Sequence, residues 1–165
     1  MKKYMYMSFI VALLCSISLC FTACGDDDEK DMTRPSITDT GITANPINCQ
    51  IYHRGEEIPV RYVFTDNVEL GKFNIEIHGN FDHHTHSTEA VECEEEEHEH
   101  EEGTPSNPWV YNHDYDIPTG LQTYTTDINI LIPTDIATGH YHFMIRVTDQ
   151  AGWQEIKSVA IEIEE

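Results

Sequence analysis

Apolar and polar side chains alternate along five stretches of this chain. The alternating stretches are residues 58–64, 73–78, 126–132, 141–147 and 159–164. A period of two places successive side chains on opposite faces of an extended strand, so each stretch predicts a β-strand that buries one face. Segments rich in Asp, Asn, Pro and Gly separate the stretches, and these residues favour turns. Because no stretch shows a helical period, we predict an all-β domain of antiparallel strands.

The N-terminal residues carry a targeting signal. Lys2 and Lys3 precede a nearly uncharged stretch, Tyr4–Leu19, which is typical of a secretory signal peptide over residues 1–23. The sequence Phe-Thr-Ala directly before Cys24 resembles a lipobox, the lipidation site of bacterial lipoproteins. Lipid on Cys24 would anchor the chain to a membrane.

An acidic tether, residues 24–34, follows the predicted lipidation site. It resembles the surface-export signal of Bacteroidetes lipoproteins, and a plain solvated spacer is the alternative interpretation. We therefore expect an outer-membrane lipoprotein that is exposed at the cell surface, with residues 35–165 as its folded domain.

The C-terminal part of the chain has the pattern of a known fold. Gly139 and Tyr141 open a strand, and the run Thr148 to Gly152 (Thr-Asp-Gln-Ala-Gly) leads into the closing strand. This pattern resembles the last hairpin of bacterial immunoglobulin-like domains, and VRYVFTDNVELGKFNIEI resembles an earlier strand–turn–strand of the same domains. With the lipobox, the chain resembles an uncharacterised family of Bacteroidetes Ig-like surface lipoproteins with a His-rich insertion. The resemblance implies an immunoglobulin-like antiparallel β-sandwich of about seven strands. On this topology the expected strands are A around residues 37–51, B over 58–64, C over 72–79, a short D near 109–115, E over 124–132, F over 140–148 and G over 156–164. It says little about activity, because this fold hosts many functions.

Two cysteines, Cys49 and Cys93, remain after the signal peptide and Cys24 are set aside. In an oxidising compartment they are expected to form a disulfide. The alternative is that Cys93 provides a thiolate metal ligand beside the neighbouring histidines.

The chain is strongly acidic. Without Lys2 and Lys3 it has 7 basic and 30 acidic residues, a formal charge of −23. This charge argues against a nucleic-acid partner, because phosphate binding needs the opposite sign. Divalent cations, or simple solubility at a crowded surface, fit the charge better.

A His/Glu-rich insertion, residues 78–108, follows the predicted third strand. Six of the ten histidines lie between His78 and His100, among many carboxylates. Neutral imidazole is the commonest protein metal ligand, and with carboxylates it suits Zn²⁺, Cu²⁺ or Ni²⁺. We predict a divalent transition-metal site, with Zn²⁺ as the first choice. Its predicted ligands are His78, His83, His84, His86, His98, His100, His140 and His142.

Sandwich topology predicts where these histidines meet. Strand C, residues 72–79, and strand F, residues 140–148, should be antiparallel neighbours, which brings the end of C beside the start of F. Alternation then places His78, His140 and His142 on one outward, solvent-exposed face. His53 should reach the same end of the sandwich from the loop before strand B, and His113 is left unplaced. Carboxylates that could ligate a metal or orient the imidazoles are Asp82, Glu97, Glu99 and Glu101.

Other interpretations of these segments stay open. The acidic run 92–102 has the composition of a solvated loop, which would bind metals only weakly or not at all. Asp66, Asn67 and Asp149 could bind Ca²⁺ through oxygen, although Asp and Asn are also ordinary turn residues. An aromatic carbohydrate platform is conceivable, but its members are equally suited to the core or its rim. The aromatic candidates are Trp109, Tyr111, Tyr115 and Tyr124.

Two classes of function follow from the sequence. The first is a surface lipoprotein that captures, buffers or hands over zinc or a similar ion. The second is a non-catalytic interaction module, such as an accessory subunit of an outer-membrane transporter or a glycan-binding partner. No nucleophile–base pair and no phosphate loop is recognisable, so we do not expect an enzyme.

Overall fold

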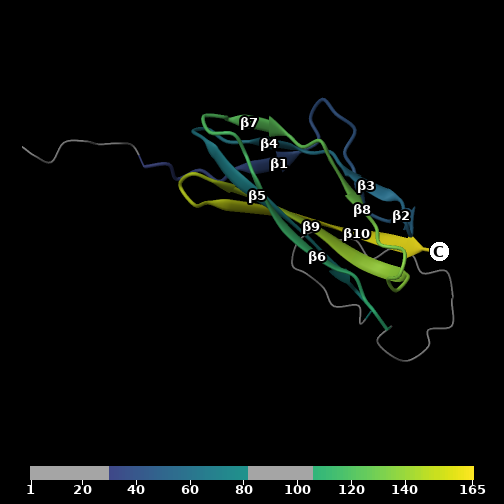
Figure 1. The fold of residues 1–165 in the computed structure, drawn as a ribbon. Coiled ribbons are helices and arrows are strands. Elements are labelled where there is room, and N and C mark those ends of the chain that lie inside the picture. Colours follow the sequence, from purple (N-terminus) through teal and green to yellow (C-terminus); the bar gives the residue numbers. More distant parts are fainter. Residues whose placement is uncertain (1–29, 82–105) are drawn as a thin grey trace, which may run out of the picture. The chain divides into compact units, whose positions relative to one another are not determined.

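Two layers of strands form an all-β sandwich in the computed structural model, which describes residues 30–81 and 106–165 (Figure 1). The larger sheet contains, in spatial order, β2 (Gln50–His53), β10 (Gln154–Glu164), β9 (Gly139–Asp149), β5 (Leu70–Gly79) and β6 (Val110–Asp116). The opposite layer consists of β1 (Ser36–Thr38), β4 (Val63–Thr65) and β7 (Thr123–Thr125), with β3 (Glu57–Val60) paired to β8 (Ile128–Leu131). The described residues contain no helix, which confirms the predicted fold class.

The core lies between the two layers and follows the predicted alternation. Tyr141, Phe143 and Ile145 on β9 are buried, as are Ile75 and Ile77 on β5. Rings from both layers meet there. Phe64 and Phe73 lie with their ring centroids 5.2 Å apart, and Phe73 stacks on Tyr115 at 4.8 Å. Aromatic contacts of this kind add to the stabilisation that burial alone provides.

Two predicted strands are each divided in two. The predicted strand over residues 58–64 becomes β3 and β4, and the strand expected over 124–132 becomes β7 and β8. At the break, the hydroxyl of Thr126 accepts a hydrogen bond from the Tyr62 amide (2.8 Å) and donates to the Val60 carbonyl (3.0 Å). The hydrogen bonds of the Thr126 side chain therefore hold the β3–β4 segment against the β7–β8 segment where the regular pairing stops.

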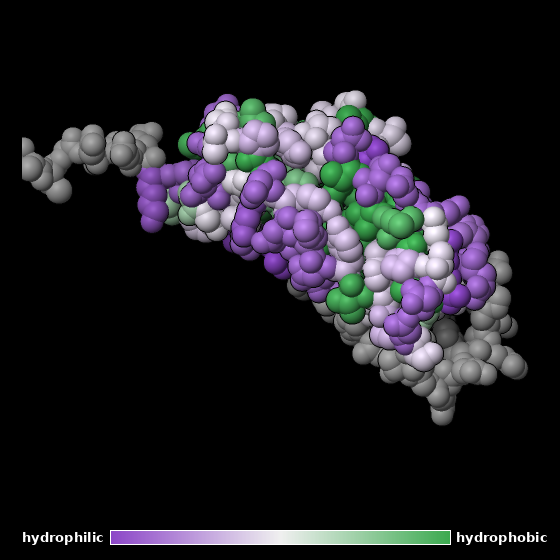
Figure 2. All heavy atoms as spheres, in the orientation of Figure 1, coloured by the Kyte–Doolittle hydropathy of each residue, from purple (hydrophilic) through white to green (hydrophobic). Residues whose placement is uncertain are grey.

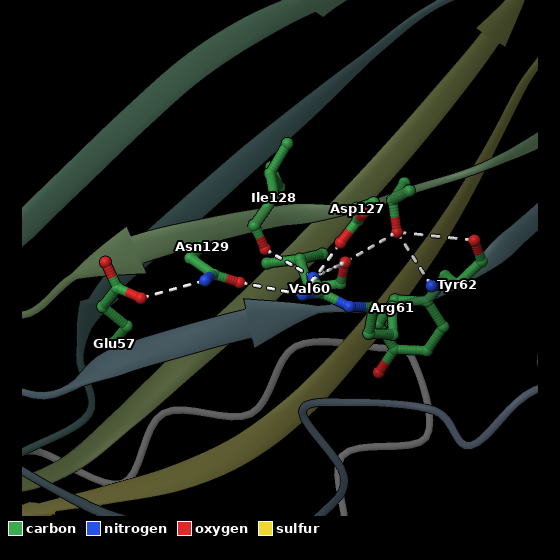
Figure 3. A network of polar contacts seen from close by, with 8 residues as sticks. Glu57, Val60, Arg61, Tyr62, Asp127, Ile128 and Asn129 are labelled. Atoms are coloured by element: carbon green, nitrogen blue, oxygen red, sulfur yellow. Dashed lines mark hydrogen bonds and ion pairs between the residues drawn. The ribbon is translucent and has the colours of Figure 1, made fainter.

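Arg61, beside this break, also connects the two segments. The Arg61 guanidinium donates to the Ile128 carbonyl (2.8 Å) and lies 2.9 Å from Asp127 (Figure 3). It also donates to the side chain of Asn129, which in turn donates to Glu57. The network holds β3 against β8 beside the break.

The first predicted strand, around residues 37–51, belongs to both layers. β1 pairs antiparallel with β4, whereas β2 pairs parallel with β10 at the edge of the larger sheet. The short strand expected near residues 109–115 is β6, which extends the larger sheet by pairing with β5. β5 and β9 are antiparallel neighbours, with Gly79 opposite Tyr141, so the predicted pairing of strands C and F is confirmed.

Exposed apolar side chains are few among the described residues. Figure 2 shows one face of the molecule, on which hydrophilic residues surround a central group of apolar residues and smaller apolar groups. The large exposed apolar residues, Met32, Ile47, Ile51, Val68, Val110 and Leu131, come from different segments. Within residues 30–81 and 106–165 there is no apolar helix of a length that could span a membrane.

Candidate metal centre

Four histidines lie at one end of the larger sheet, which we call the histidine pole: His53, His78, His140 and His142. The strand directions bring them there, because β2, β5 and β10 end at this pole and β9 begins there. In the register of the sheet, His53 lies opposite Glu164, His140 opposite Glu162, and His78 opposite His142.

His78 and His142 lie side by side at this pole. They are direct cross-strand partners on β5 and β9, and their ring centroids lie 5.5 Å apart. Both occupy positions that alternate with core residues such as Ile77 and Phe143, so they share the outward face of the sheet. Two imidazoles held this way by paired strands suit neighbouring positions around one metal ion.

The burial of this pair differs from the sequence-based expectation. His142 is only 3% exposed, and the side chain of His78 is 19% exposed. The predicted face is right, but the prediction that His142 is solvent-exposed is wrong. Alternation indicates which side of a sheet a residue occupies, and it carries no information on what surrounds that side.

A carboxylate lies beside the pair. Glu76 Oε1 is 3.2 Å from Nδ1 of His78, two residues along the same strand and on the same face. Metal-ligating histidines commonly have such a carboxylate contact at their other nitrogen.

His53 and His113 are placed apart from this pair. His53 lies 3.5 Å from both Glu56 and Glu164, and its strand β2 is separated from β9 by β10. His113 lies on β6, where its ring makes an edge contact with Tyr115 at 4.7 Å. We therefore assign neither to the pair.

The remaining predicted ligands, His83, His84, His86, His98 and His100, lie outside the described residues, as do Asp82, Glu97, Glu99 and Glu101. In the described part of the chain, the histidine pole holds no set of three ligand atoms within 4.8 Å of one another. It offers an imidazole pair with one adjacent carboxylate.

Cys49 is disulfide-bonded and lies beside the pole. Its amide donates to the Ala160 carbonyl of β10 (2.8 Å), which fixes the cysteine against the larger sheet. Its backbone φ is +61°, an uncommon conformation for a residue with a side chain. The predicted partner, Cys93, lies outside the described residues, so the Cys49–Cys93 pairing stays a prediction.

The aromatic candidates belong mainly to the core. Trp109 is 7% exposed, and its amide donates to the Tyr141 hydroxyl, which itself donates to the Ala137 carbonyl. Burial raises the pKa of Tyr141. Tyr115 and Tyr124 are half-buried against the same core, which favours the core interpretation over a carbohydrate platform.

A comparison with known families decides what this chain is related to. A family model described as a domain of unknown function, DUF4625, matches residues 22–164. The chain belongs to the DUF4625 family. A search of curated proteins gave no match.

The DUF4625 chain also brings acidic residues together at the end opposite the histidine pole. Asp66 and Asp149, two of the three residues weighed as calcium ligands, form a close group with Asp31. The third, Asn67, instead donates a hydrogen bond to Asp31 (3.2 Å). Asp31 was not predicted, because within the acidic tether it is one carboxylate among several and no local pattern marks it.

Proposed function

We propose that this protein is a Bacteroidetes surface lipoprotein that binds a divalent transition metal, Zn²⁺ first, through the histidine pole. In this proposal residues 1–23 are a signal peptide, Cys24 carries the lipid, and the acidic tether links the membrane to an immunoglobulin-like domain. The role would be capture, buffering or handover of the ion at the outer membrane.

The observation that carries the proposal is the His78–His142 pair. Both rings are held on long, paired strands of the larger sheet, so their relative position is fixed before a metal arrives. Preorganised ligands lose little conformational freedom on binding, which favours affinity. Glu76 beside His78 adds the carboxylate contact that such sites use.

Further ligands would come from the same region. His140 is the second residue of β9 and lies two residues before His142 in the sequence. Five further histidines of the His/Glu-rich insertion, between residues 83 and 100, follow β5 in the sequence and are candidate ligands. Zn²⁺ takes four ligands in structural sites, and Cu²⁺ or Ni²⁺ accepts the same nitrogen and carboxylate donors.

Calorimetric titration of the full chain, held in detergent, with Zn²⁺, Cu²⁺ and Ni²⁺ at about pH 7.5 tests the proposal, because imidazole is mostly neutral there. We expect a dissociation constant for at least one ion tighter than about 100 μM, a free energy of roughly −5.5 kcal/mol. Affinity should fall below about pH 6, because protons compete for imidazole. Weaker binding of all three ions would contradict metal capture and favour a non-catalytic interaction module.

The strand pair is tested separately. His78→Gln and His142→Gln should each weaken binding at least about tenfold, or 1.4 kcal/mol. His113→Gln is the matched control, since it removes an exposed histidine from β6 away from the pair. Thermal melts of each variant show whether the sandwich is intact. Unchanged affinity in the folded double variant would mean that the pair takes no part in metal binding.

A further inference from the structure

Three carboxylates that are far apart in the sequence meet at the end opposite the histidine pole. Asp31 precedes β1, Asp66 follows β4, and Asp149 ends β9. Each contributes one oxygen to a group whose members lie within 4.8 Å of one another, and we call this group the acidic triad. Asp149 is 4% exposed, and the other two are half-buried.

One oxygen of each carboxylate is already held by N–H donors. Asp66 Oδ1 accepts hydrogen bonds from the amides of Val68 (2.9 Å) and Glu69 (2.8 Å). Asp149 Oδ1 accepts from the amide of Trp153 (2.8 Å). Asp31 Oδ1 accepts from the Thr33 amide and the Asn67 side chain. These bonds fix the orientation of all three carboxylates.

The second oxygens are the unusual feature. Oδ2 of Asp149 and Oδ2 of Asp66 are both buried, and neither accepts a hydrogen bond from any residue in the ranges 30–81 and 106–165. In the part of the chain that the structure describes, no lysine or arginine forms an ion pair with the triad. Burying a carboxylate oxygen without a donor or a cation is costly, and three negative charges at this spacing also repel one another.

We infer that the acidic triad binds a hard divalent cation of the Ca²⁺ type. Ca²⁺ prefers oxygen ligands at about 2.3–2.6 Å, so two oxygens on one ion lie at most about 5 Å apart. The spacing of the triad satisfies this limit without rearrangement. Turn propensity accounts for the bonds at Oδ1 of Asp66 and Asp149, but it leaves their second, buried oxygens unexplained.

The cation would also fasten the acidic tether to the domain. Asp31 lies in the acidic tether, directly after Lys30, the first residue that the structure describes. Its carbonyl accepts a hydrogen bond from Nε1 of Trp153 (3.0 Å). An ion shared by Asp31, Asp66 and Asp149 would hold the start of the domain against both turns. This site is distinct from the histidine pole in position and in ligand chemistry, so either can fail without the other.

Calorimetric titration of the full chain with CaCl₂ and MgCl₂ tests the inference. Three carboxylates with water completing the shell should give a Ca²⁺ dissociation constant of about 10⁻⁴–10⁻³ M, with Mg²⁺ weaker because it sheds water reluctantly. Asp149→Asn and Asp66→Asn keep an Oδ1 acceptor for the turn amides and remove the charge. Each should weaken this binding at least tenfold. Asp116→Asn is the matched control, because it removes an exposed carboxylate at the same end of the sandwich.

Thermal melts separate a cation site from a purely structural turn. In chelator, Asp149→Asn should melt at or above the temperature of the unchanged chain, because it relieves repulsion within the triad. In excess Ca²⁺ the order should reverse, because only the unchanged chain gains from the ion. A variant that loses the same stability with and without Ca²⁺ would show that Asp149 serves the turn alone.

Limited trypsin digestion reports on the tether. Lys30 is exposed and precedes Asp31, whereas Arg34 precedes Pro35 and is therefore a poor trypsin site. Ca²⁺ should slow cleavage after Lys30 in the unchanged chain and have no effect on Asp149→Asn. No Ca²⁺ binding up to about 10 mM, or equal binding by the unchanged chain and both triad variants, would overturn the inference.

Discussion

At the scale of single residues, Thr126 has a stabilising role that the alternation of apolar and polar residues does not indicate. Its side chain is fully buried and bonds to Tyr62 and Val60 across the break between β7 and β8. The buried hydroxyl accepts from the Tyr62 amide and gives the Val60 carbonyl a second donor beside Arg61, so it contributes to two buried backbone groups at once. Threonine fits because its methyl group fills the apolar space beside the hydroxyl.

Thr126→Val should destabilise the domain by about 1–3 kcal/mol, because it keeps the shape, removes the acceptor of the buried Tyr62 amide and leaves the Val60 carbonyl with only its bond from Arg61. Urea unfolding followed by tryptophan fluorescence measures the change. Thr126→Ser is the control, since it keeps the hydroxyl and loses only a buried methyl group, about 1 kcal/mol. Equal stability of Thr126→Val and the unchanged chain would contradict this account.

At the scale of elements, the sequence predicts the long strands and their buried faces, but it does not predict which sheet the shortest strands join. β5, β9 and β10 have ten or eleven residues each, long enough for alternation to identify the buried face. β1 and β2 have three and four residues, and such short runs give no information about which sheet they join. Their division between the two layers, and the parallel β2–β10 pairing, depend on tertiary contacts.

The candidate sites show the same limit. The neighbouring positions of His78 and His142 followed from the expected pairing of two long strands, and this part was predictable. The burial of His142 was not, because alternation describes one sheet and not its surroundings. The acidic triad joins residues from three separate segments, one of them in the tether, so only the folded chain reveals Asp31 as a member.

The expected disulfide between Cys49 and Cys93 gives a prediction about stability. A disulfide to Cys93 would close a long loop and stabilise the domain by about 4 kcal/mol in the chain-entropy model. Cys49→Ser and Cys93→Ser should therefore lower the free energy of unfolding by the same amount. Peptide mapping without reductant should recover the two cysteines in one linked pair. Full stability of Cys93→Ser would contradict the pairing.

At the scale of the whole molecule, buried tyrosines set an alkaline limit to stability. Burial raises the pKa of Tyr52 from 10.0 to about 12, and it also raises the pKa values of Tyr62, Tyr115 and Tyr141. Each folded pKa lies above the unfolded value. The stability from these groups is therefore fully present below about pH 10 and is lost as the pH rises through the folded pKa values.

The free energy of unfolding should fall steadily from pH 10 to 12, and Tyr52 alone should account for about 1 kcal/mol of the loss by pH 11. Tyr52→Phe should reduce the loss between pH 8 and pH 11 by that amount. The same variant at about pH 7 serves as the reference, because it loses only the hydrogen bond from Tyr52 to Asn45. An unchanged pH slope in Tyr52→Phe would contradict the assignment.

The edge strand β6 affects whether copies of this molecule can associate through their sheets. An edge strand exposes unpaired backbone groups that can add a strand from another chain and start aggregation. Four of the seven positions of β6 are Asn112, His113, Asp114 and Asp116, all exposed. A second β6 paired with it would bring the carboxylates of the two copies close together, and like charges on neighbouring strands repel. The polar edge therefore disfavours stacking of sandwiches into fibres.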